Sequence, residues 1–115
     1  MTAIESLIEQ RVSMDKKTLL ALKEAGDDEQ IVRYIDHSFT SGSEHSLEKL
    51  LQSLEKMNFG GLKILPQEGD YFLLECFSID CTEFHAVNKT SVLMTMLAEQ
   101  FEVEYDGWGT SVANE

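Results

Sequence analysis

The spacing of apolar residues in this chain switches between a helical and an extended period, and the order of those switches restricts the fold. Segments with a helical period alternate with short runs rich in β-branched and aromatic residues, which are typical of strands. The predicted order is helix, strand, helix, strand, strand, helix, strand. We therefore predict an α+β fold: an extra N-terminal helix followed by a ferredoxin-like βαββαβ unit, whose antiparallel sheet carries two helices on one face.

The first predicted helix covers about residues 3–25, because apolar residues recur there at helical spacing. They are Ile4, Ile8, Val12, Leu19 and Leu22. Asp15 interrupts this stripe, and Gly26 follows the helix as a C-cap. Because the other half of the helix is polar, we predict a surface position, with the N-terminal turns away from the core.

The predicted ferredoxin-like core occupies residues 30–112. Its elements are a strand over 31–39, a helix ending near 58, strands near 62–66 and 71–79, a helix over about 83–100, and a last strand near 103–105. The polar residues 40–43 should end the first strand and cap the next helix. Residues 106–109 should then turn the chain. A chain of 115 residues fits one domain, so we assign residues 1–115 to a single domain.

The charge of the chain excludes one class of function. It has 21 acidic and 9 basic residues, a net charge of −12. Because phosphate recognition needs clustered Lys and Arg, we expect no direct binding to nucleic acid. Residues 1–57 have 11 acids and 7 bases, whereas residues 58–115 have 10 acids and only Lys63 and Lys89 as bases. The C-terminal half therefore serves either solubility or docking of a basic protein segment.

The sequence also indicates where the protein works. Its apolar runs are too short to cross a bilayer, and its N-terminus lacks the features of a signal peptide. Two cysteines are too few for a disulfide scaffold. We expect a cytoplasmic monomer with free thiols and no membrane partner.

Residues with potential for chemistry do not form a recognisable site. Cys76, Cys81, Glu83 and His85 lie close in sequence but lack the paired spacing of a zinc site. Acidic neighbours would also raise the pKa of the Cys81 thiol, which disfavours a nucleophile. We predict no catalytic, cofactor-binding or metal-binding residues, and we expect His37 to be packed and hydrogen-bonded. A small Cys/His enzyme remains the less favoured alternative.

The most distinctive segment lies near the C-terminus, where two glycines flank the only tryptophan. We expect Trp108 to pack against one end of the core. The functional alternative is an aromatic anchor for a partner, beside acidic residues. The candidate partner-binding residues are Glu102, Glu104, Tyr105, Asp106 and Trp108.

Residues 101–110, Phe-Glu-Val-Glu-Tyr-Asp-Gly-Trp-Gly-Thr, resemble the C-terminal signature of the regulator of ribonuclease E activity B (RraB) family. Residues 25–28, 34–37 and 46–49 are similar to that family as well, as is the helix end at 97–101. The likeness extends over about residues 15–112.

The resemblance implies a ferredoxin-like, non-enzymatic cytoplasmic protein. It also implies that the protein binds ribonuclease E, through the noncatalytic basic region of that enzyme, and reduces its endonucleolytic activity. An acidic or immunity-like protein-binding module with a different partner is the main alternative.

Overall fold

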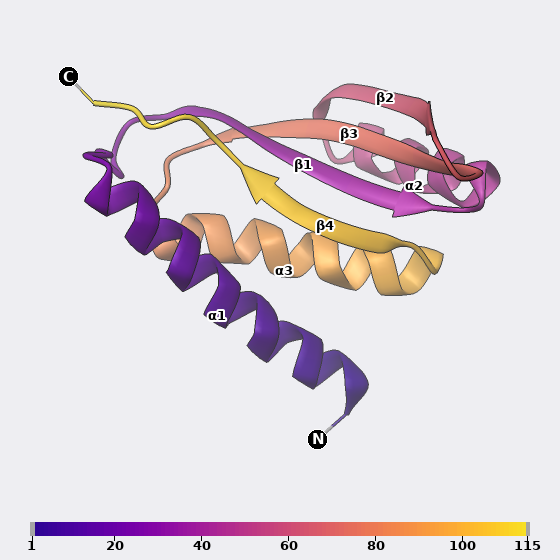
Figure 1. The fold of residues 1–115 in the computed structure, drawn as a ribbon, viewed down its shortest axis with the longest axis horizontal. Helices are drawn as coiled ribbons and strands as arrows, with labels where there is room; N and C mark the ends of the chain where they lie inside the picture. Colours follow the sequence, from indigo (N-terminus) through magenta and orange to yellow (C-terminus); the bar gives the residue numbers. More distant parts are fainter. Residues whose placement is uncertain (1, 115) are drawn as a thin grey trace.

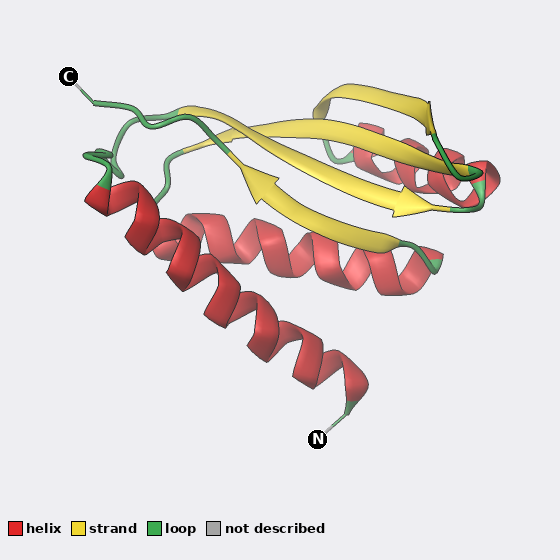
Figure 2. Ribbon diagram, in the orientation of Figure 1, coloured by secondary structure: helices red, strands yellow, loops and turns green. Residues whose placement is uncertain are grey.

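A computed structural model describes residues 2–114, and its elements follow the predicted order (Figures 1 and 2). They are α1 (Ala3–Glu24), β1 (Arg33–Ser41), α2 (Glu44–Lys56), β2 (Gly60–Gln67), β3 (Tyr71–Asp80), α3 (Phe84–Phe101) and β4 (Glu104–Gly109). The α+β class and the order of elements are therefore confirmed.

The strands form one antiparallel sheet in the order β2-β3-β1-β4. Helices α2 and α3 pack on one face of this sheet, whereas α1 lies beside α3 and outside the two-layer unit (Figure 1). The N-terminal end of α1 projects away from the sheet (Figure 1). The structure thus has the predicted ferredoxin-like arrangement, with β1 at the centre of the sheet between β3 and β4.

The hydrophobic core lies between the sheet and helices α2 and α3. Its fully buried side chains are Phe39, Leu47, Leu50, Leu54, Leu74 and Met94. The leucines of α2 repeat at helical spacing, so they form one apolar face toward the sheet. In β1, Ile35, His37 and Phe39 alternate with more exposed residues and share the face that packs on the helices.

The helix ends agree with their sequence signals. Thr2 and Glu5 form a capping box at the start of α1, and Ser43 from the predicted polar cluster caps α2. Glu83 accepts a hydrogen bond from the Ala86 backbone and caps α3. Among residues 2–114, no helix combines the length and the apolar character needed to cross a membrane.

The first strand is displaced by two residues from its predicted bounds. It begins at Arg33 because the Ile31 amide donates to the Asp28 carbonyl and closes a turn. At its other end, Thr40 and Ser41 pair with β3 instead of leaving the sheet. Pairing with β3, and for Thr40 also with β4, thus overrides the local turn preference of these residues.

The predicted turn at residues 106–109 is wrong, because these residues belong to β4. Trp108 pairs with His37 of β1, and the register shifts between Ser38 and Phe39. Gly107 adopts a φ of 103° beside this shift, a conformation that glycine allows without a steric penalty. The Asp-Gly sequence therefore forms a β-bulge in an edge strand rather than a turn.

Candidate protein-binding site

One face of the sheet is not covered by any of residues 2–114. Strand alternation places on it the side chains of Tyr34, Asp36, Glu75, Phe77, Ile79, Glu104 and Asp106, together with Lys63. We call this surface the open sheet face. It combines four carboxylates with exposed aromatic and aliphatic groups.

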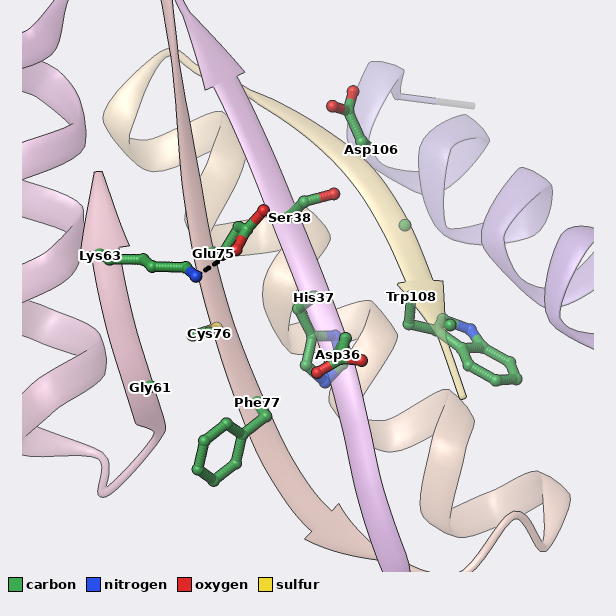
Figure 3. A pocket seen from close by; sticks show the side chains of 12 residues that line it. Asp36, His37, Ser38, Gly61, Lys63, Glu75, Cys76, Phe77, Asp106 and Trp108 are labelled. Atoms are coloured by element: carbon green, nitrogen blue, oxygen red, sulfur yellow. Dashed lines mark ion pairs between the residues drawn. The ribbon is translucent and has the colours of Figure 1, made fainter. Parts of the chain in front are cut away.

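A hollow of about 530 Å³ lies on the open sheet face, and residues of all four strands line it (Figure 3). Lys63 is the only cationic side chain in its lining, and its Nζ atom lies 3.2 Å from Glu75 Oε2. Burial and the nearby Glu104 raise the pKa of Asp106, although a hydrogen bond from Thr40 opposes them. The carboxylates of the open sheet face thus outnumber its cations, which makes the hollow attractive to a positive group.

Phe77 forms the apolar part of the hollow. Its ring lies over Gly60 and Gly61, where an added Cβ atom would stand 2.6 Å from ring carbons at either position. The ring also meets Tyr34 edge to face, with centroids 4.8 Å apart. The two adjacent glycines, which match no phosphate-binding motif, therefore make room for this ring.

The structure separates the predicted partner-binding residues into two groups. Glu104 and Asp106 are exposed on the open sheet face, and Glu102 is exposed at the C-cap of α3. Tyr105 and Trp108 are half-buried and take part in hydrogen bonds within the protein. Strand pairing adds Asp36 and Glu75 to the acidic group, although they are distant from it in sequence.

A buried carboxylate holds α1 against the rest of the domain. Asp15 is fully buried, and it accepts hydrogen bonds from Trp108 Nε1 at 2.8 Å, Asn88 Nδ2 at 3.0 Å and the Ser91 hydroxyl. Arg11 Nε donates to the same carboxylate at 3.3 Å. This role of Asp15 was not predicted from the sequence. The available signal was the position of Asp15 within the apolar stripe, since a polar residue on a buried face needs partners.

The polar contacts continue into the sheet. The Arg11 guanidinium lies 5.2 Å from the centre of the Tyr105 ring, and the Tyr105 hydroxyl lies 2.8 Å from His37 Nδ1. His37 Nε2 is 3.0 Å from the Ser78 hydroxyl. Burial lowers the pKa of His37 to about 4, so the ring is neutral at pH 7. The predicted packed, hydrogen-bonded histidine is confirmed.

The residues considered for metal binding or cysteine chemistry have other surroundings. Cys76 is buried on the helix-facing side of β3, where burial and the charge of Asp36 raise the pKa of its thiol to about 12. Cys81 is half-buried, and both thiols are free in the structure. Within residues 2–114, no three His, Cys, Asp or Glu side chains gather as a potential metal site.

Fold and surface together define a class: a small acidic α+β domain with a ferredoxin-like sheet that residues 2–114 cover on one side only. A family profile described as "RraB: Regulator of ribonuclease activity B" matches residues 13–110. The chain belongs to this family, which confirms the resemblance seen in the sequence, and the name of the family denotes regulation of a ribonuclease.

Two curated proteins with the name "Regulator of ribonuclease activity B" are similar to this chain. The protein from Colwellia psychrerythraea is 28% identical over 114 residues, covering 93% of this chain and 96% of its own length. The protein from Photobacterium profundum is 25% identical over 112 residues, covering 90% and 82% respectively. The similarity to both proteins therefore extends over nearly the whole domain.

Proposed function

We propose that this protein is a non-enzymatic, cytoplasmic and monomeric inhibitor that binds ribonuclease E and reduces its endonucleolytic activity. Membership in a family named for regulation of ribonuclease activity carries this proposal. The choice of ribonuclease E follows the resemblance of the C-terminal segment.

The charge of the chain supports a mechanism for this inhibition. The acidic C-terminal half engages a basic segment in the noncatalytic region of the enzyme, with Glu102, Glu104 and Asp106 as exposed contacts. Tyr105 and Trp108 hold the last strand in position through their hydrogen bonds. Because basic segments also hold RNA, occupying them weakens substrate capture without blocking the catalytic centre.

The test compares full-length ribonuclease E with its isolated catalytic region. We expect the protein to bind the full-length enzyme and slow cleavage of a structured RNA, with no effect on the isolated catalytic region. Binding should weaken as salt rises, mainly through a slower association rate, because exposed charges are screened over about 8–10 Å at physiological salt. Equal inhibition of both enzymes, or affinity that salt leaves unchanged, would contradict the proposed mechanism.

A matched pair of variants tests the acidic contacts. Glu102→Lys/Glu104→Lys should weaken binding more than Glu48→Lys/Glu55→Lys, which changes the net charge equally on the exposed side of α2. Both double variants should stay folded, since all four side chains are exposed. If the two variants bind equally well, Glu102 and Glu104 are not contacts.

A further inference from the structure

We propose that the open sheet face is the surface on which a basic segment docks, with one cationic side chain in the hollow and an adjacent apolar residue against Tyr34 and Ile79. The identity of the partner rests on the proposed function above, whereas the surface and its chemistry are inferred from the fold. The open sheet face shares Glu104 and Asp106 with the predicted C-terminal contact site, but its central residues come from β1 and β3.

The distribution of charge selects a cationic occupant. Asp36, Glu75, Glu104 and Asp106 come together from three strands. Lys63 is the one basic side chain on the open sheet face among residues 2–114, and it already pairs with Glu75. By contrast, α1 and α2 carry most of the remaining lysines: Lys16, Lys17, Lys23, Lys49 and Lys56. A positive segment is therefore attracted to the sheet side of the molecule and less strongly to the helix side.

Exposed apolar groups on the same face indicate that charge is not the whole interaction. Tyr34 is 63% exposed and Ile79 is 62% exposed, and the two residues are paired across β1 and β3. Phe77 lies next to them and lines the hollow. An arginine fits this combination, because its aliphatic stem and planar guanidinium can pack on aromatic rings while its charge meets a carboxylate. We therefore infer a segment in which arginine alternates with apolar residues.

A second apolar hollow suits this occupant less well. It lies between the C-terminal half of α1 and the start of α3, lined by Leu20 and Phe84. Lys16 and Lys23 also line it, and Lys16 Nζ already lies 5.5 Å from the centre of the Phe84 ring. These lysines repel a cationic segment, although acidic residues 27–29 lie at the same hollow. Leu20 at this hollow provides the apolar position of a matched control.

The main experiment measures binding of a fragment of the noncatalytic basic region of ribonuclease E to two double variants. Asp36→Lys/Ile79→Ser alters the open sheet face, and Glu48→Lys/Leu20→Ser makes equivalent chemical changes on the helix side. Because the change in net charge is identical, long-range attraction falls equally in both. We expect the open-face variant to bind at least about tenfold more weakly than the control, since it loses a local ion pair and an apolar contact. Unfolding midpoints of both variants establish that they are folded.

A second experiment tests the docking surface independently of the identity of the partner. Amide shifts of the wild-type protein are followed by NMR while a synthetic peptide of alternating arginine and tryptophan is added. The largest shifts should fall on β1 and β3 residues of the open sheet face and disappear in Asp36→Lys/Ile79→Ser. If the ribonuclease fragment fails to bind while the peptide produces these shifts, the proposed partner is wrong, but the open sheet face is still a docking surface for a basic segment.

Three results would contradict the proposal that the open sheet face is the docking surface. The first is equal binding of the fragment by both double variants. The second is that the peptide of arginine and tryptophan does not bind, or that the amide shifts it causes fall on α1 and α2. The third is a wild-type dimer that Asp36→Lys/Ile79→Ser converts to monomers, since the face would then be occupied by a second copy.

Discussion

Polar side chains in buried positions determine how the last strand and the first helix join the domain. Asp15 lies on the buried side of α1 and His37 lies in β1, and each is hydrogen-bonded to side chains from other elements. Within residues 2–114, every buried side-chain nitrogen and oxygen has a hydrogen-bond partner. Such satisfied contacts orient the elements, because any displacement leaves a buried polar group without a partner.

Substitutions of Trp108 test whether these buried hydrogen bonds stabilise the domain. Trp108→Ala should lower the free energy of unfolding by about 3–5 kcal/mol, because the substitution removes a large packed ring and a donor to Asp15. Trp108→Phe retains most of the ring but not the indole N–H, and should cost about 1–3 kcal/mol. Urea denaturation measures both values. An unchanged midpoint with loss of partner binding would instead identify Trp108 as an exposed anchor.

The lowered pKa of His37 predicts that the stability of the protein depends on pH. Burial lowers the pKa of His37 to about 4 in the folded protein, below the ordinary value of 6.5 expected for the unfolded chain. The unfolded chain therefore binds a proton first as the pH falls, and the stabilisation present above pH 6.5 is lost toward pH 4. Between about pH 7 and pH 5 this loss should amount to about 2 kcal/mol.

The control for this pH effect is His37→Gln, which cannot titrate. Its free energy of unfolding, measured in urea at each pH, should fall less steeply than that of the wild type between about pH 7 and pH 5. Parallel curves for the two proteins would show that other groups cause the pH dependence.

At the scale of an element, the buried residues of α1 are polar rather than apolar. Its two buried residues are Arg11 and Asp15, whereas the residues of its apolar stripe, Ile4, Ile8, Val12, Leu19 and Leu22, are half-buried. The position of α1 beside α3 and β4 therefore depends on the donors that Asn88 and Trp108 supply to Asp15. Helical periodicity alone would have assigned this anchoring role to the apolar stripe.

The bulge in β4 predicts different outcomes for two glycines in the same strand. Gly107→Ala should destabilise the protein by about 1–3 kcal/mol, because Gly107 has a φ of 103° that an L side chain rarely adopts. Gly109→Ala should have little effect, since an added Cβ there meets no atom within 4 Å and no positive φ is required. Thermal or urea denaturation compares them. Equal effects of the two substitutions would mean that β4 does not need the bulge.

At the scale of the whole molecule, the net charge of −12 acts on folding and on binding in opposite directions. Raising NaCl from about 0.02 M to about 0.5 M should raise the unfolding midpoint, because salt screens repulsion among the acidic side chains. Over the same range, affinity for a basic partner should fall. A scan of midpoint and affinity in the same buffers measures both trends. A midpoint that falls with salt would indicate that attractive ion pairs outweigh the repulsion.

The sequence by itself determined the type and order of the elements, because the period of apolar residues is a local property of each segment. It also predicted a cap for α2 within residues 40–43, which Ser43 supplies, and a packed His37. Both results depend on residues a few positions apart.

Only the tertiary structure decided whether residues 106–109 turn or extend, because their pairing partners in β1 lie about seventy positions away in the sequence. The same long-range pairing placed Asp36 and Glu75 beside Asp106, and packing of α1 gave Asp15 its donors. A candidate surface assembled from different strands leaves no local pattern, since each residue contributes one side chain and the sheet supplies the proximity.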